Sequence, residues 1–438
     1  MDFISRLSSK TLDAHPQSFA IKRIMSAALE AADPDRAVRA ALIREDKALK
    51  VGGQTFELDE FNNVYIIAFG KAAPAMASAA RQVIGDALKG GIVVSKYKTA
   101  HDLGGLSLHL AGHPVPDECS KFAGDAILSL LSTCSANDLV LFLISGGGSA
   151  LITSPVDGVS LADLQELTSL LLSSGARIDE INTLRRALDR IKGGGLAYAA
   201  NPAKQVSLLL SDVVDSRLEA IASGPTVPNS TGNADALAVL EKYGLLGKIP
   251  AAVLDVLLKD TKIPLTFFGK TLIVGSNLIS AEAANDVAVQ EGFRAEILTT
   301  SLQGEAAEKG RELAKHLLSV EERLSCIIVG GETTVTLGEN PGLGGRNQEL
   351  ALAAVELLDR VEDVLFITLA TDGDDGPTDA AGAVVNRETF IRARNRGNDP
   401  QVYLRAHSAY PFFDQLGDLL KINPTGTNVN DLVFLFTF

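Results

Sequence analysis

Glycine-rich loops follow several short apolar runs in this sequence, and they hold the first residues that could carry chemistry. The apolar run 139–144 leads directly into Ser145-Gly146-Gly147-Gly148-Ser149. Glycines allow a ligand to approach the backbone closely, and successive N–H groups can bind an anion. The alternative is a flexible turn, but a turn seldom needs three glycines flanked by serines. We therefore expect this loop to bind a phosphate or carboxylate group.

Three basic residues accompany glycines and are candidates for the same anion. Lys71 follows Gly70 after the apolar run 64–69, Lys192 precedes three glycines, and Arg346 follows a glycine-rich loop at the start of a predicted helix. A cation at a helix start is unfavourable unless it meets an anion, and arginine binds phosphate through two N–H groups. The alternatives are ordinary surface side chains for Lys71 and Arg346, and a helix-ending residue for Lys192.

Aspartates follow two other apolar runs. Asp212 comes directly after the run 206–210, where a Mg²⁺ ligand, a general base or a helix N-cap would each fit. Asp372 comes after the run 364–370 and begins a segment with four aspartates in eight positions. Mg²⁺ takes one or two carboxylates together with substrate phosphates, so this segment is a magnesium candidate, with a solvated turn as the alternative.

The common nucleotide and hydrolase signatures are missing. The sequence has no G-x-x-x-x-G-K-[ST] loop, no G-x-G-x-x-G after a strand with an acid some twenty residues later, no G-x-S-x-G and no H-E-x-x-H. His113 is interpreted as a structural residue. These absences argue against a dinucleotide-dependent oxidoreductase, a serine hydrolase and a zinc protease.

The elements that must position these residues alternate between strand and helix. Continuous apolar runs predict buried strands, and the intervening helical patterns predict parallel sheets with helices on both faces. The fold class is therefore α/β, with two domains of mainly parallel sheet sandwiched by helices. Turn-forming residues at 225–265 mark the boundary, which we set between domains 1–240 and 241–438. Ligands bind beyond the carboxyl ends of such strands, which is where the candidate residues stand.

The composition and net charge indicate which binding partners do not suit this protein. The chain has 438 residues, a net charge of −14 and 46% hydrophobic residues, which predicts a globular protein with a large core. The acidic balance argues against binding to nucleic acid or to an anionic membrane. Three widely spaced cysteines and the absence of a signal-peptide pattern favour the cytoplasm. The oligomeric state stays open, and a homo-oligomer is compatible with the sequence.

Long segments of the chain resemble the glycerate 2-kinase family, also called the MOFRL family, some of whose members carry the name hydroxypyruvate reductase. The segments that carry this resemblance, in chain order, are SGGGSALI, RIKGGGLA, LLLSDVVD with IASGPTVP, GGETTVTLG, GLGGRNQELALAA, ATDGDDGPTDAAGA and PTGTNVNDL. The resemblance covers nearly the whole chain. Where the family pattern continues SDVV with GDD, this chain has Asp215-Ser216-Arg217.

The resemblance implies ATP- and Mg²⁺-dependent phosphorylation of D-glycerate at its 2-hydroxyl. It implies a glycerate kinase domain followed by a MOFRL domain, and active-site roles for Lys71 and Arg346, which we expect to meet across an interdomain cleft. The glycine loop would then bind phosphate, while Asp212 or Asp372 would hold Mg²⁺, or Asp212 would orient the substrate hydroxyl. An NAD(P)H-dependent hydroxypyruvate reductase and a non-catalytic anion-binding protein are the alternatives.

Overall fold

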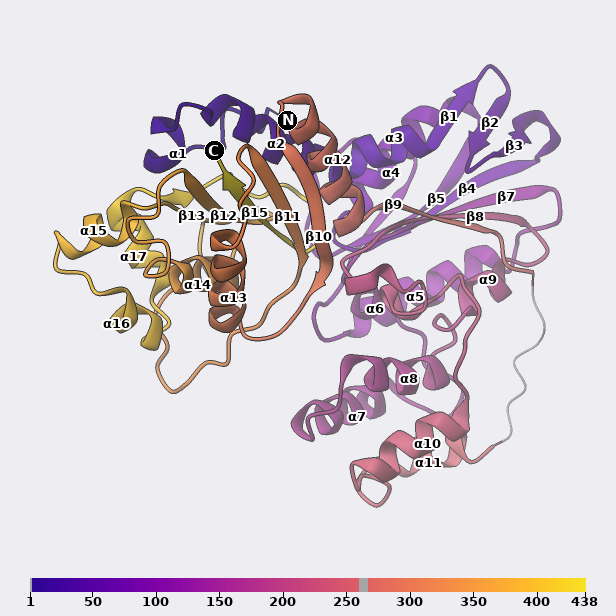
Figure 1. The fold of residues 1–438 in the computed structure, drawn as a ribbon. Coiled ribbons are helices and arrows are strands. Elements are labelled where there is room, and N and C mark those ends of the chain that lie inside the picture. Colours follow the sequence, from indigo (N-terminus) through magenta and orange to yellow (C-terminus); the bar gives the residue numbers. More distant parts are fainter. Residues whose placement is uncertain (1, 260–266) are drawn as a thin grey trace. The chain divides into compact units, whose positions relative to one another are not determined.

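The computed structural model describes residues 2–259 and 267–438, and the chain divides into two compact units (Figure 1). Unit 1 combines Met1–Asp33 with Gly275–Phe438, and unit 2 is Pro34–Val274. The expected boundary at residues 240/241 differs from this division, since it falls inside a helix whose Leu240 is packed in the apolar core of unit 2. The part of the expected boundary zone at residues 260–266 lies outside the described residues.

Unit 2 is built on a six-stranded sheet of order β6-β5-β4-β7-β8-β9. The four pairings that join β6, β5, β4, β7 and β8 are all parallel, as the sequence predicts. Every residue of β7 is buried, which explains its continuous apolar pattern. The strands are β4 (Asn63–Phe69), β5 (Leu88–Ser95), β6 (Ser107–Leu110), β7 (Asp138–Ile144), β8 (Lys204–Leu210) and β9 (Lys270–Gly275).

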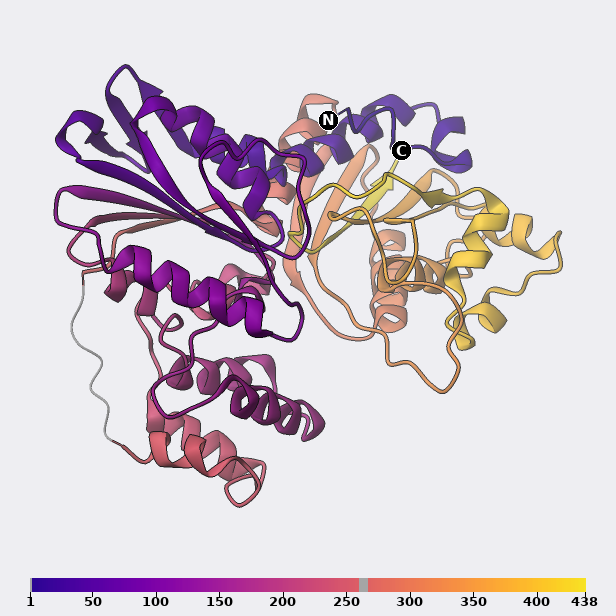
Figure 2. The same ribbon diagram turned by 180° about the vertical axis from the view of Figure 1, so that it is seen from behind.

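Helices cover both faces of this sheet (Figures 1 and 2). One face carries α3 (Pro34–Ala41) and α4 (Ala73–Ile84), and the other carries α5 (Glu118–Leu131), α6 (Gly148–Leu151) and α9 (Gly195–Ala200). Beyond the second group lies a helical layer with its own apolar core, formed by α7 (Leu161–Ser173), α8 (Ile178–Leu188), α10 (Asn233–Lys242) and α11 (Ala251–Leu257).

The helical sequence pattern at residues 178–199 predicts one continuous helix, and this prediction is wrong, because the chain breaks between α8 and α9. Asp189 is extended, and its carboxylate accepts hydrogen bonds from the N–H groups of Ile191 and Ser154. Gly193 and Gly194 then take positive φ angles of 58° and 89°. The glycines thus turn the chain here and do not merely end a helix.

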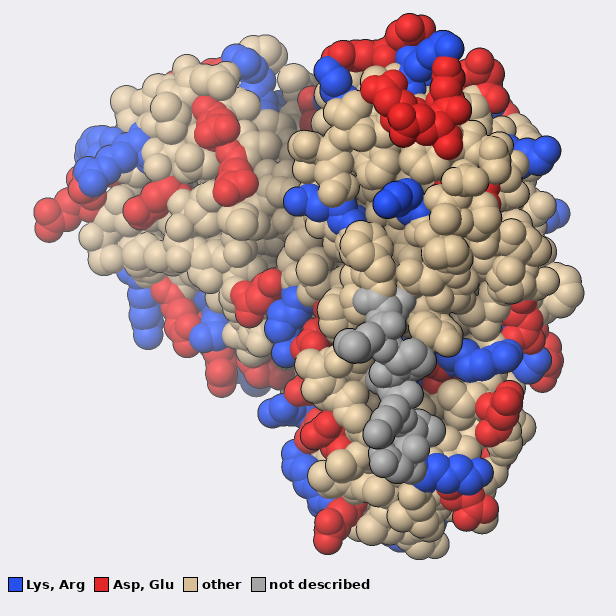
Figure 3. Space-filling view, turned by 90° about the vertical axis from the view of Figure 1, so that its right-hand side faces the viewer, with Lys and Arg blue, Asp and Glu red and all other residues tan. Residues whose placement is uncertain are grey.

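A small antiparallel sheet also belongs to unit 2. It consists of β1 (Leu42–Glu45), β2 (Ala48–Val51) and β3 (Gln54–Glu57). Figure 3 shows acidic side chains gathered over this end of the unit, with single basic side chains among them.

Unit 1 holds a second six-stranded sheet, and here the expectation of mainly parallel strands is wrong. Its order is β10-β11-β15-β12-β13-β14, and only the β10·β11 pair is parallel among the pairs described. The C-terminal strand β15 inserts between β11 and β12 and runs opposite to both. The strands are β10 (Arg294–Leu302), β11 (Ser325–Gly331), β12 (Val364–Ala370), β13 (Gly382–Val385), β14 (Leu419–Leu420) and β15 (Asp431–Thr437).

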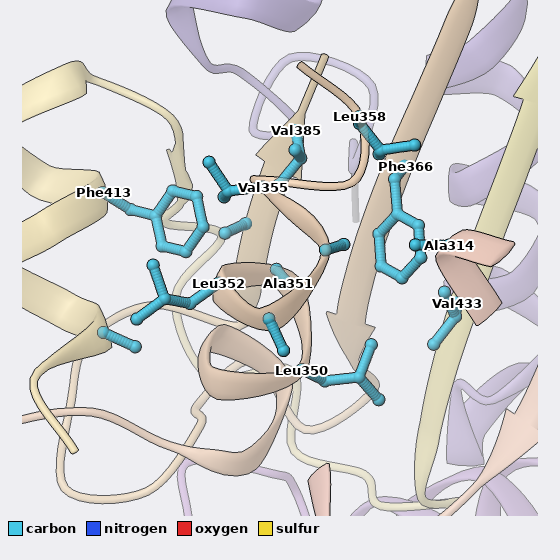
Figure 4. Packing of buried hydrophobic residues seen from close by; sticks show 14 of the residues in the cluster. Ala314, Leu350, Ala351, Leu352, Val355, Leu358, Phe366, Val385, Phe413 and Val433 are labelled. Carbon is cyan, nitrogen blue, oxygen red and sulfur yellow. The ribbon is translucent and has the colours of Figure 1, made fainter. Parts of the chain in front are cut away.

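Helices cover both faces of this sheet as well. The N-terminal α2 packs with α12 against one face, which explains why the first 33 residues belong to unit 1. On the other face, α14 packs Leu350 and Leu352 among Phe366, Phe413 and Val433 (Figure 4). The helices are α1 (Lys10–Ala14), α2 (Ser18–Ala31), α12 (Asn277–Gln290), α13 (Ala306–Leu318), α14 (Arg346–Ala354), α15 (Thr389–Arg394), α16 (Pro400–Arg405) and α17 (Ala409–Leu416).

No helix within residues 2–259 and 267–438 combines the length and the apolar character that crossing a lipid bilayer requires.

Candidate functional site

Two strand ends of unit 2 bring Lys71 to the triglycine loop. The N–H of Lys71 donates to the carbonyl oxygen of Gly146 over 2.9 Å, and the N–H of Ala72 donates to Ser145 Oγ over 3.0 Å. Gly70, with φ 126°, is required here, since a Cβ on it would lie 2.2 Å from Ser145 Oγ. The Lys71 side chain itself is exposed, so its ammonium is available to a ligand.

The triglycine loop presents backbone donors at this edge of the sheet. Gly148 N–H donates back to Ser145 O over 3.3 Å, which closes a tight turn. Among the described residues, neither Gly146 N–H nor Gly147 N–H donates to a protein acceptor. Two adjacent N–H groups without protein partners, beside a lysine, form an arrangement suited to an anion.

Asp212 stands against the same loop from the end of β8. A Cβ on Gly146 would lie 2.0 Å from Asp212 Oδ2, so the glycine permits this close approach. Burial raises the pKa of Asp212, while a hydrogen bond from its own backbone N–H and the charge of Lys71 oppose that rise. The structure therefore brings Lys71, Asp212 and the glycine loop together.

His113 is predicted from the sequence to be a structural residue, yet its ring lies next to Gly147 of this loop. Its Nε2 lies 3.1 Å from the position that a Cβ on Gly147 would take, and the same Cβ would lie 3.4 Å from Lys71 Cγ. Burial lowers the pKa of His113, and the charges of Lys71 and Lys96 lower it further. A neutral imidazole is therefore favoured near neutral pH. No spacing in the sequence links His113 to residues 145–148, so only the fold reveals this contact.

Ser149 is partly buried and Lys192 is buried, and both have partners within unit 2. Ser149 Oγ is 2.8 Å from Ser223 Oγ. The Lys192 side chain is only 3% exposed, and its ammonium donates to Asp189 Oδ2 over 2.9 Å and to Ile152 O over 3.0 Å. Burial lowers the pKa of Lys192, and the charge of Asp189 opposes this. Lys192 thus has an internal ion pair that was not predicted from the sequence.

In unit 1, Arg346 lies at the start of α14, at the sheet edge where β11 ends and β15 begins. Its Nε and Nη2 donate to the two carboxylate oxygens of Asp431 over 2.5 and 3.2 Å, and its Nη1 donates to Glu332 over 2.6 Å. Burial lowers the pKa of Arg346, but the carboxylates of Asp431 and Glu332 outweigh burial and raise it overall. The anion that a cation at this helix start requires is supplied by the chain itself.

The four aspartates after β12 separate in the structure. Asp372 lies at the edge near Arg346, and burial raises its pKa to about 6. Asp375 is buried and accepts the N–H groups of Asn347 and Gln348 at the start of α14; burial raises its pKa to about 7. Asp374 and Asp379 are exposed. Within residues 2–259 and 267–438, no group of three or more His, Cys, Asp or Glu side chains is arranged to hold a metal ion.

Comparisons with known proteins cover most of the chain. Residues 20–258 match a family described as a domain of unknown function (DUF4147), and residues 325–431 match the MOFRL family. A D-glycerate 2-kinase of Thermotoga maritima is 43% identical over 419 residues, covering 94% of this chain and 96% of that protein. A protein of Agrobacterium vitis with a hydroxypyruvate reductase name is 39% identical over 421 residues, covering 94% of this chain and 92% of its own.

A crystal structure of glycerate kinase from Thermotoga maritima superimposes with a TM-score of 0.86 at 41% identity, covering 97% of this chain and 100% of that one. The fold is therefore that of an α/β kinase of small hydroxy acids. This chain belongs to the glycerate 2-kinase family, in which some members carry the reductase name.

Proposed function

We propose that this chain transfers the terminal phosphoryl group of ATP to the 2-hydroxyl of D-glycerate, giving 2-phosphoglycerate and ADP. The observation that carries the proposal is the 43% identity to a D-glycerate 2-kinase over 94% of the chain. A match over 94% of the chain includes residues of both units. The hydroxypyruvate reductase alternative lacks a dinucleotide fingerprint after any strand.

Phosphoryl transfer depends on positioning and on neutralising charge, more than on covalent chemistry by the protein. Lys71 offers an exposed ammonium beside two backbone N–H groups that have no protein acceptor. These groups would hold the phosphate oxygens and stabilise the charge that spreads over them during transfer. Asp212, whose pKa burial raises, would accept the hydroxyl proton more readily than an exposed carboxylate, and so orient or deprotonate the acceptor.

The donor set fits Mg²⁺ in its chemistry. The Asp212 and Asp372 carboxylates each have an oxygen that accepts no hydrogen bond from the described residues. Mg²⁺ is commonly held by one or two carboxylates, with phosphates and water completing its shell, so isolated carboxylates suffice. Asp212 or Asp372 would hold the ion, which when bound neutralises phosphate charge.

Arg346 would contribute a second positive charge to phosphoryl transfer, in addition to Lys71. The support for this is that each cation lies at the ligand-binding edge of its own sheet. Three of the five N–H donors of Arg346 are engaged by Asp431 and Glu332, which leaves two for a phosphate. A double-mutant cycle of Lys71→Ala and Arg346→Ala should show strong non-additivity in kcat if both act on one transition state. Additive losses would separate the two roles.

The deciding experiment supplies the protein with Mg²⁺, ATP and D-glycerate and identifies the phosphoglycerate isomer by NMR. Formation of 2-phosphoglycerate supports the proposal, while the 3-isomer or no ATP consumption contradicts it. A parallel reaction with hydroxypyruvate and NADH, followed by absorbance, tests the reductase alternative.

A further inference from the structure

A small internal cavity in unit 2 lies between the helical layer and the segments that follow α6 and α8. Leucine and isoleucine side chains of α7 and α8 form the apolar part of its wall. The polar lining residues include Ser149, Thr153, Arg185, Asp189 and Lys192. The volume open to a water-sized group is about 30 Å³, which is room for about two such groups.

The cavity carries more positive than negative charge. Among the described residues, Arg185 makes one hydrogen bond, from Nη1 to Asn182 Oδ1 over 3.2 Å, and it has no carboxylate within ion-pair distance. Lys192 uses two of its three N–H donors, on Asp189 and on Ile152 O. Arg185 and Lys192 therefore share the single charge of Asp189, and one cation remains without a counter-ion.

An uncompensated cation in a largely enclosed cavity is costly, and a bound anion removes that cost. Burial lowers the pKa of Arg185, and only the charge of Asp189 opposes this, in agreement with the missing counter-ion. The pair of cations also matches a carboxylate, since guanidinium N–H groups bind both of its oxygens.

Hydrogen bonds link this cavity to the glycine loop. Ser149, the residue after Gly148, lies 2.8 Å from Ser223 Oγ, and Ser223 Oγ donates to Asn182 Oδ1 over 3.0 Å. The same Asn182 Oδ1 accepts from Arg185. A ligand held by Arg185 is thereby connected to the loop that would hold phosphate.

We propose that Arg185 binds the carboxylate of the acceptor hydroxy acid in this cavity. This inference rests on the proposed function. About two water-sized groups correspond to the two oxygens of a carboxylate, whereas a purine ring or a triphosphate is much larger than this space.

The test compares wild type with Arg185→Gln and with Arg185→Lys, which keeps the charge. Arg190→Gln is the matched control, because Arg190 follows α8, is 49% exposed and does not line the cavity. For each protein, kcat and KM are measured for D-glycerate, for its neutral amide D-glyceramide and for ATP. Binding of D-glycerate is measured separately by its effect on melting temperature in the presence of Mg²⁺ and a non-hydrolysable ATP analogue.

Arg185→Gln should lower kcat/KM for D-glycerate by about 10- to 100-fold, the range for a hydrogen bond to a charged group. The same variant should keep the wild-type kcat/KM for D-glyceramide and for ATP. Arg185→Lys should show a smaller loss with D-glycerate, and the control Arg190→Gln should have the kinetic constants of wild type. Equal losses with glycerate and glyceramide would indicate a merely structural role and overturn the assignment. A rise in the KM for ATP alone would assign the cavity to a phosphate and also overturn it.

The thermal measurement separates this inference from the proposed function. Stabilisation of wild type but not of Arg185→Gln by D-glycerate supports the carboxylate site even if no phosphoglycerate forms. Formation of 2-phosphoglycerate with equal stabilisation of both proteins overturns the Arg185 assignment and leaves the kinase function standing.

Discussion

Replacing Gly146 by alanine tests the close approach of Gly146 and Asp212, on which the candidate site of unit 2 depends. The added Cβ would lie 2.0 Å from Asp212 Oδ2 and 2.5 Å from Asp212 Cγ, whereas ordinary contact begins near 3.4 Å. The two residues must therefore separate by about 1.4 Å. A shift of the loop also moves Lys71, because Gly146 O accepts the N–H of Lys71, and a shift of the Asp212 side chain moves its carboxylate away from the loop.

A displacement of about 1 Å at reacting groups can cost about 10²-fold in rate, so we expect kcat of Gly146→Ala to fall by about that factor. Overpacking at such a position also costs about 1–3 kcal/mol of stability. Steady-state formation of phosphoglycerate gives kcat and KM, and urea unfolding followed by circular dichroism gives the stability.

Gly105→Ala is the matched control. It lies in the same unit and has no positive φ, and an added Cβ meets no heavy atom within 4 Å, so both turnover and stability should stay unchanged. A folded Gly146→Ala protein with kcat within about twofold of wild type would refute the reasoning, since the geometry predicts a loss nearer 10²-fold.

Three further outcomes follow from the same structure. Lys71→Ala should lower kcat by about 10³-fold, the scale of a charge-stabilising group. The melting temperature should stay unchanged because the side chain is exposed, and near-normal turnover would exclude Lys71 from the site. Lys192→Met removes the ion-pair partner of the buried Asp189 and leaves only the more distant charge of Arg185 near it. It should cost about 3 kcal/mol in urea unfolding, the lower end for a broken buried pair, and an unchanged midpoint would contradict this. Hydrogen bonds from Lys242 and Tyr243 lower the pKa of Glu180 to about 2, so its stabilising effect is complete above its unfolded pKa of about 4.3 and is lost as the pH falls toward 2. Glu180→Gln should therefore lose less stability than wild type over that range, and parallel pH profiles would contradict the ion pair.

The strands of the fold were largely predictable from the sequence, because a strand buried on both faces is apolar throughout. The predicted run 364–370 coincides with β12, and 139–144 matches β7 within one residue. Strand direction was not predictable, since β15 is as continuously buried between antiparallel neighbours as β7 is between parallel ones. The docking of the N-terminal helices on unit 1 was also missed, because it depends on contacts between residues far apart in the chain.

The position of the candidate site could be predicted, but the pairing of its charges could not. A glycine loop after a buried strand marks the edge where ligands bind, and Lys71 and Asp212 indeed meet residues 145–148 there. Lys192 precedes three glycines much as a phosphate-binding lysine would, yet its ammonium turns inward to Asp189, three residues earlier. The Lys192 side chain can reach Asp189 because the chain leaves the helical conformation after α8. The helical pattern of the sequence did not predict this break.

Arg346 was expected to meet an anion, and the structure shows that this anion is a carboxylate of the chain itself. A cation at the start of α14 requires an anion, and Asp431, 85 residues away in the sequence, provides a bidentate one because β15 begins beside the end of β11. Glu332 adds a second carboxylate, so a phosphate at this guanidinium must share it with two negative groups. Lys71 meets no such competition, since no ion pair engages it among the described residues. Binding of the anionic groups of the substrates should therefore depend mainly on Lys71. Arg346 should contribute most when further positive charge, such as a bound divalent cation, offsets its carboxylate partners.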